Sequence, residues 1–219
     1  MITFEQIKAN EEIKTYIKAA DESLTSLQFT EHSFAHVVRT ADVAGDILTQ
    51  LGYSERVAEL GRIAGYMHDI GNVINRIDHA QSGAVMAFRI LDKLGMPAEE
   101  IARIVCAIGN HDEGTAYPVN EVAAALIIAD KSDVRRSRVR DKGSINFDIH
   151  DRVNYAVEKS KLEINRENQL ITLNLTVDEK ISPISEYFEI FMGRMILCRR
   201  AAGYFGLKFE ININGMRVM

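Results

Sequence analysis

The chain has 219 residues, a formal net charge of −5, 47% hydrophobic residues and 26% charged residues, a balance that is ordinary for a globular protein. The acidic balance excludes a general electrostatic attraction to nucleic acid or anionic membranes. No apolar run approaches the roughly 20 residues that span a bilayer. The isolated cysteines Cys106 and Cys198 indicate reduced core thiols instead of a disulfide framework. We therefore expect a cytoplasmic protein.

Up to about residue 140, apolar residues recur with a helical period. Glycines follow several of these segments, as at Gly52, Gly71 and Gly95, and Pro97 stands in the first turn of another. The pattern predicts helices over residues 5–20, 30–52, 54–71, 78–95, 96–111 and 120–140.

Beyond residue 140 the pattern changes. Residues 141–148 indicate a loop and 149–160 one more helix, and apolar residues then alternate through 161–177 around a polar turn, as in a β-hairpin. An amphipathic helix follows over 182–206, and 207–213 alternates again as a third strand. The sequence thus predicts a mainly α fold. A helical bundle over residues 1–140 is followed by a C-terminal α+β extension over 141–219, whose small antiparallel sheet and single amphipathic helix pack on the bundle.

Histidines and aspartates gather at the ends of the predicted helices. A lone histidine on an apolar face is more often a hydrogen-bonded core residue than a ligand. Here, however, five helices contribute to one set: His36, His68, Asp69, His79, His111 and Asp130. Imidazoles and carboxylates suit a divalent transition metal, and such ligands converge inside helical bundles. Six ligands are enough for two ions, and Asp69, about 100° round the helix from His68, could bridge them.

The segments that carry these residues resemble the HD superfamily of metal-dependent phosphohydrolases. The motifs are "HVVRTADVAG", "AGYMHDIGN", "HAQSGA", "GNHDEG" and "IIAD", between roughly residues 30 and 135. The short-spaced "HxxxGA" and "HxxG" elements are similar to the two-metal branch, which includes symmetrical dinucleoside tetraphosphate hydrolases. The resemblance implies a first metal on His36, His68, Asp69 and Asp130 and a second on His79 and His111. Asp69 would bridge the two metals and be essential for catalysis.

Two histidines stay outside this set. His32 lies one turn before His36, but the small residues that follow fit the family register counted from His36. His150, in a second His-Asp dipeptide, has none of the flanking pattern, and we interpret that dipeptide as a helix start. Asp112 and Glu113 are interpreted as surface residues, although one could contact metal-bound water.

The resemblance implies hydrolysis of a phosphoester or phosphoanhydride, most naturally of a nucleotide, by a metal-activated bridging water. Iron or manganese is the expected metal, with zinc, nickel or magnesium as alternatives. The expected partner is a small phosphorylated substrate, with no nucleic acid and no membrane. The sheet could cover the bundle, shape the pocket or form the edge of a homodimer.

Residues 131–140 form the densest basic stretch in this acidic chain. Arginine forks match phosphate oxygens, but a solvated helix end is an equally good explanation for most of these residues. If the helix continues, Arg138 lies about 80° round from Asp130 and is the first candidate for substrate binding, ahead of Lys131. Arg39 could face substrate or form a salt bridge. Gly114 matches a loop position that lies beside the active site in the relatives.

Two other functions stay open. Some two-metal members of the superfamily are di-iron oxygenases with the same six ligands, and only the basic stretch favours hydrolysis over oxygenation. The bundle could also be a non-catalytic ligand-sensing or regulatory module. Six intact ligands argue against that, because a sensor that had lost catalysis would be expected to lose some of them.

Overall fold

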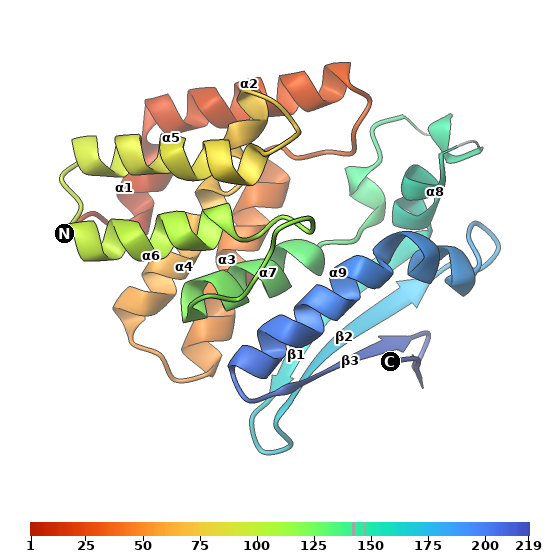
Figure 1. Cartoon of the computed structure of the whole chain (residues 1–219). Helices are drawn as coiled ribbons and strands as arrows, with labels where there is room; N and C mark the ends of the chain where they lie inside the picture. The colour runs from red at the N-terminus through yellow and green to blue at the C-terminus, as the bar shows by residue number, and fades with distance from the viewer. Residues whose placement is uncertain (142, 147) are drawn as a thin grey trace.

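The computed structural model describes residues 1–141, 143–146 and 148–219, and it is mainly helical with a small sheet near the C-terminus (Figure 1). The predicted fold class is therefore confirmed. The helices up to residue 131 are α1 (Phe4–Ala9), α2 (Glu11–Ser26), α3 (Phe34–Gln50), α4 (Glu55–Met67), α5 (His79–Lys93), α6 (Ala98–Gly109) and α7 (Glu121–Lys131). Short 3-10 turns η1 (Ile70–Val73), η2 (Arg136–Arg138) and η3 (Ser144–Asn146) lie in the connections, and α8 (Ile149–Ala156) precedes the sheet.

Local capping moves two helix starts from their predicted positions. The single helix predicted over residues 5–20 is two helices, because the Asn10 side chain accepts a hydrogen bond from the Ile13 N–H and starts α2. The helix predicted to start at Thr30 begins after Ser33, whose hydroxyl accepts a hydrogen bond from the Ala35 N–H. Several polar residues compete for each cap position, and the structure selects one of them.

The helix predicted over residues 120–140 ends at Lys131, so the expected continuation to Arg138 is wrong. The chain leaves the helix at Ser132 and turns Asp133 and Val134 into the interior. Arg138 lies instead on η2, where it is buried. Burial of the Asp133 carboxylate among arginines requires this turn, because a buried charge is stable only when it is paired.

The sheet has the order β1-β2-β3-β4, and it is mixed, whereas the sequence predicted an antiparallel one. β1 (Val157–Asn165) and β2 (Leu170–Val177) form the predicted hairpin, but β3 (Lys208–Ile213) pairs with β2 in parallel. The reason is α9 (Ile184–Tyr204), which carries the chain back across the sheet, as a parallel pair requires. The short β4 (Met216–Arg217) pairs with β3 antiparallel.

The helix predicted over residues 149–160 ends at Ala156, and β1 begins at the next residue. After Val157 no residue of this strand is fully buried, and its first residues include Glu158, Lys159 and Lys161. Polar edge strands of this kind are hard to separate from a helix end by pattern alone.

Two apolar cores share three helices. One core joins α1 to α7, with Tyr66 and Met67 among its residues. The other joins α3, α4 and α7 to α9 and to the inner face of the sheet, with Phe191 and Ile211 among its residues. Figure 1 shows α9 lying over the sheet, on the side of the helical bundle. In the described ranges, no helix is long and apolar enough to cross a membrane.

Candidate metal centre

The six predicted ligands come together at the ends of five helices, and we call them the His–Asp cluster. His36 lies in the first turn of α3, His68 follows the last residue of α4, His79 begins α5, His111 follows α6, and Asp130 lies in the last turn of α7. Asp69 follows His68 and precedes η1. The four histidines and Asp69 are buried, and Asp130 is nearly so.

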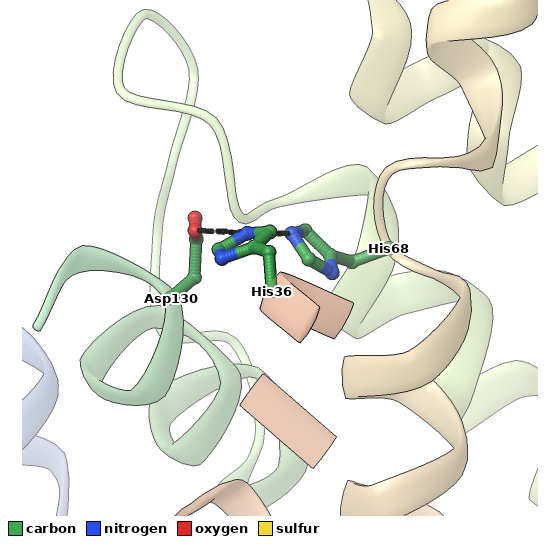
Figure 2. Close-up of side chains that lie close together, drawn as sticks. All are labelled: His36, His68 and Asp130. Atoms are coloured by element: carbon green, nitrogen blue, oxygen red, sulfur yellow. Dashed lines mark hydrogen bonds and ion pairs between the residues drawn. The ribbon is translucent and has the colours of Figure 1, made fainter. Parts of the chain in front are cut away.

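His36, His68 and Asp130 form one half of the cluster (Figure 2). The Nε2 atoms of the two histidines lie 3.3 Å apart, and Asp130 Oδ1 lies 3.3 Å from His36 Nε2 and 3.8 Å from His68 Nε2. Asp69 joins them through Oδ2, which lies 3.6 Å from His36 Nε2 and 3.2 Å from His68 Nε2. Two nitrogens that bind one ion at about 2.1 Å lie roughly 3.0–3.4 Å apart, so these spacings suit a shared metal.

His79 and His111 form the other half. Their Nε2 atoms lie 3.3 Å apart. The second oxygen of Asp69, Oδ1, lies 3.4 Å from His79 Nε2 and 3.9 Å from His111 Nε2. The Asn72 amide donates to the same Oδ1 at 3.0 Å and so holds the carboxylate in this orientation. The two oxygens of Asp69 therefore face two different histidine pairs.

The tautomers of the four histidines follow from their outer hydrogen bonds. Each Nδ1 donates to an oxygen that can only accept: His36 to the Asp133 carboxylate (2.8 Å), and His68, His79 and His111 to the carbonyls of Gly65 (2.8 Å), Arg76 (3.0 Å) and Ile108 (2.6 Å). In the neutral rings Nε2 then carries a lone pair. Nitrogens that face each other at 3.3 Å can share a proton or a metal ion, and here they lie as the ligands of a metal site would.

The burial and the charges of the residues in the cluster also favour a bound cation. Oδ2 of Asp69 is buried and has no hydrogen-bond partner among the described residues. Burial alone would raise the pKa of Asp69, but His68 holds that pKa well below its usual value, so the carboxylate is ionised. Burial lowers the pKa of His111, and the positive charges of His68 and Lys131 lower it further. A neutral imidazole and an unpaired buried carboxylate oxygen fit a divalent cation.

Asp133 is a functional residue that the sequence analysis missed. Its buried carboxylate accepts the His36 Nδ1 hydrogen bond and lies 3.0 Å from Arg39 Nε and 2.9 Å from Arg135 Nε. Burial would raise the pKa of Asp133, but His36 and then Arg138 hold it well below its usual value. Asp133 therefore orients His36 as an ionised acceptor. Its spacing of three residues from Asp130 was the available signal.

A pocket of about 540 Å³ opens over the His–Asp cluster, a volume typical of small-molecule sites. Asp69, His79, His111 and Asp130 form part of its wall. Four cationic side chains also line it: Arg76, Lys131, Arg138 and Arg194. The predicted substrate-binding residues Lys131 and Arg138 are thus present, the latter from η2 and not from α7.

Arg76 and Arg194 were not predicted to line this pocket. Arg76 Nη1 donates to His79 Nε2 at 3.3 Å, and its guanidinium lies over the Phe29 ring, 5.7 Å from the centroid. This contact places the positive charge of Arg76 beside the lone pair of His79 Nε2, the atom that would bind a second metal ion. No sequence pattern distinguished Arg76 from the other arginines of the chain.

Arg39 and Gly114 do not line the pocket. Arg39 Nε pairs with Asp133, and its Nη2 donates to the Ser160 carbonyl at 3.0 Å, so the structure gives it the salt-bridge role that was the alternative. Gly114 lies in an exposed turn, although the preceding Asp112 and Glu113 do line the pocket. Loop position in the sequence could not decide which of these neighbours faces inward.

The two excluded histidines line the pocket but lie outside the cluster. The His32 ring is 5.4 Å from the His36 ring, and its Nδ1 is 2.7 Å from the Thr30 carbonyl. His150 lies in the first turn of α8, where Asp148 caps the helix, as expected for a helix start. Its side chain is 60% exposed, at the pocket rim.

Gly71 allows the close approach that positions both halves of the cluster. A Cβ at this residue would lie 2.0 Å from the His79 carbonyl oxygen and 2.5 Å from the Gly83 nitrogen. The segment after Asp69 can therefore rest on the start of α5 only if residue 71 has no side chain. This explains the glycine that closes "HDIG".

We expect Gly71→Ala to destabilise the fold by about 3 kcal/mol, because backbone atoms cannot move aside as a flexible side chain could. Denaturant unfolding would measure the loss. Gly203→Ala is the matched control, since a Cβ there meets no described atom within 4 Å and alanine favours the helix by about 1 kcal/mol at most. Equal stability of the Gly71 variant and wild type would contradict the close approach.

Comparison with known proteins adds two findings. The family model described as the HD domain matches residues 33–156, a range that contains the whole His–Asp cluster and Asp133. Among solved structures, the chain is similar to a predicted HD superfamily hydrolase from an uncultured Thermotogales bacterium, with 24% sequence identity, a TM-score of 0.45, and coverage of 57% of this chain and 67% of that chain. A search of curated proteins found no match to this chain.

Proposed function

The chain belongs to the HD domain family, whose model matches more than half of it, and on this premise we propose that it is a metal-dependent phosphohydrolase with two divalent ions. The proposed reaction is hydrolysis of a phosphoester or phosphoanhydride in a small substrate, with a nucleotide as the first class to test. Iron and manganese are the metals proposed first, because the cluster mixes imidazole and carboxylate ligands.

The main observation behind the proposal is that the two oxygens of the Asp69 carboxylate face two different pairs of histidines. Its Oδ2 faces His36 and His68, and its Oδ1 faces His79 and His111. His36, His68 and Asp130 would hold one ion, His79 and His111 the other, and Asp69 would bridge them. Bound there, the ions would supply an activated water at neutral pH and neutralise charge on the phosphoryl oxygens.

The protein's own residues fix the ligands before any metal binds. The outer hydrogen bonds on Nδ1 orient all four imidazoles, and Asn72 orients Asp69. Preformed ligands need little reorganisation when the metal and substrate arrive. No serine or cysteine nucleophile is required for this chemistry.

Lys131 and Arg138 are proposed to bind the phosphate that reacts. Lys131 Nζ lies 2.8 Å from Asp130 Oδ2, so it stands directly beside the cluster. Arg138 donates through Nε to the Glu31 carbonyl and through Nη1 to the Asp133 carbonyl, both at 3.0 Å. These bonds hold the buried guanidinium in place at the pocket wall, where its fork suits a phosphate group.

Metal removal tests the proposal. We expect anaerobically purified protein to contain two transition-metal ions per chain, and to release phosphate from members of a nucleotide and phosphate-ester panel without oxygen. Chelation should abolish turnover, and manganese or ferrous iron should restore it. At free metal about a hundredfold above its Kd, the loaded protein should melt roughly 5–10 °C higher than the metal-free protein.

Other outcomes would contradict it. Turnover that requires oxygen would indicate the di-iron oxygenase chemistry. A purified protein without bound metal and without turnover on the whole panel would indicate a sensing module. One ion per chain with full activity would contradict the bridging role of Asp69.

A further inference from the structure

Arg194 brings a positive charge to the pocket from outside the HD domain. It lies on α9, beyond the matched residues 33–156, yet it lines the same pocket as Asp69 and Lys131. The C-terminal extension therefore contributes to the pocket wall as well as to the apolar core.

Two contacts hold the Arg194 guanidinium in a fixed plane. Its Cζ lies 4.5 Å from the centroid of the Phe191 ring, one turn earlier on α9, and its Nε donates to Glu113 Oε1 at 2.6 Å. Both partners also line the pocket. Stacking on an aromatic ring and one carboxylate bond leave the two terminal nitrogens, which have no hydrogen-bond acceptor among the described residues. A guanidinium fixed in this way is pre-organised to bind an anion with two hydrogen bonds.

Lys131 contacts the His–Asp cluster directly, whereas Arg194 is linked to it through Glu113 and Lys131. Lys131 Nζ contacts Asp130 Oδ2 at 2.8 Å, and Glu113 Oε1 lies 3.7 Å from Lys131 Nζ. Arg194 pairs with Glu113 and contacts no residue of the His–Asp cluster within the described part of the chain. The pocket thus has an inner cation beside the metals and an outer cation on α9.

The charge of Arg194 also affects the pKa of Arg138, another residue of the pocket wall. The pKa of the buried Arg138 is lowered by desolvation, and the like charge of Arg194 lowers it further. Two guanidiniums that share a pocket repel each other until an anion lies between or beside them.

We propose that Arg194 is a specificity-determining residue that binds a second anionic group of the substrate, beyond the phosphate that reacts. The inference rests on the proposed function, and it selects substrates with two or more anionic groups, a second phosphate or a carboxylate. The extension would then act in substrate choice, while the HD domain supplies the reaction.

Binding to the metal-loaded protein tests this directly. Isothermal titration would compare inorganic phosphate, inorganic diphosphate and phosphonoacetate, with metal content measured after each titration because diphosphate can extract metals. We expect diphosphate to bind more tightly than phosphate to wild type. Arg194→Ala should weaken diphosphate binding at least about tenfold and change phosphate binding by less than about twofold. Arg194→Lys should restore only part of the loss, because an ammonium group lacks the fork.

Arg200→Ala is the matched control, an exposed arginine on the same helix, and it should bind all three probes as wild type does. A parallel loss of phosphonoacetate affinity would show that a carboxylate can be the second group, and its absence would restrict that group to phosphate.

Three results would overturn the inference: unchanged diphosphate binding in Arg194→Ala, an equal loss for phosphate and diphosphate, or a wild-type protein that does not prefer diphosphate. The proposed function is judged separately, by turnover on the panel. Arg194-dependent binding without turnover would contradict the proposed hydrolase function and support the anion-binding role of Arg194. Turnover by the wild-type protein, with unchanged diphosphate binding in Arg194→Ala, would support the hydrolase function and contradict the role of Arg194.

Discussion

Replacement of Asp69 by asparagine is expected to abolish the proposed hydrolysis, with a fall of at least roughly a thousandfold in kcat. The variant keeps the size of the side chain and removes the negative charge that two histidine pairs share. An amide would offer one oxygen and one nitrogen donor where both halves of the cluster need an acceptor. Metal analysis should therefore show a lower metal content as well. The deficit should fall first on the His79–His111 half, whose other carboxylate, Asp112, lies 4.0 Å from His79 Nε2, whereas Asp130 lies 3.3 Å from His36 Nε2.

Asp42→Asn is a control for this change, because Asp42 is exposed on α3, away from the cluster. Its activity and metal content should equal those of wild type. Full activity in the Asp69 variant would show that the cluster is not the reaction centre, whatever metal it holds. Loss of activity with an unchanged count of two ions would move Asp69 from bridging ligand to a role in catalysis alone.

Replacement of Asp133 by alanine is expected to destabilise the protein by about 3–5 kcal/mol, because it leaves buried positive charge without its partner. Arg138 is 4% exposed and Asp133 is 1% exposed, so water cannot take the place of the carboxylate. His36 would also lose the acceptor that fixes its tautomer, and metal affinity should fall about 10–100-fold. Denaturant unfolding of the metal-free protein and metal titration would measure the two effects separately.

Arg39→Ala tests whether the effect comes from burial. Arg39 also pairs with Asp133, but its side chain is 42% exposed, and an exposed ion pair contributes less than about 1 kcal/mol. A similar loss of stability in both variants would show that the whole arginine network is needed, not the buried carboxylate. A loss below about 1 kcal/mol for Asp133→Ala would contradict the assignment of Asp133 as the centre of the network.

The ligand positions could be predicted because chemistry and periodicity agree at each of them. His36 begins an inward helical stripe, and Asp130 ends a run of apolar residues where a carboxylate needs a partner. The structure brings both to the same place. Strands could be predicted in the same way from alternating residues, but alternation says nothing of pairing direction. The parallel pairing of β3 depends on the length and path of α9.

Residues whose role depends on a turn or on a distant segment could not be predicted. Asp133 orients His36 only because α7 stops at Lys131 and the chain folds inward. Arg194 meets Glu113 across 81 positions of sequence, and no periodicity links the two. Arg39 is the opposite case. Its position one turn after His36 suggested that it could face the substrate pocket, but the structure pairs it with Asp133.

The enclosure of α7 has a consequence for how the metal centre is held. Residues Val122 to Ala129 are all buried, because one side of the helix faces the bundle core and the other faces α9 and the sheet. A helix that is packed on every side can neither rotate nor slide without opening a void in a close-packed interior. Asp130 and Lys131, at its end, are therefore set at a fixed depth and angle by the apolar residues behind them. The precision of a charged site is maintained here by alanine, isoleucine and leucine.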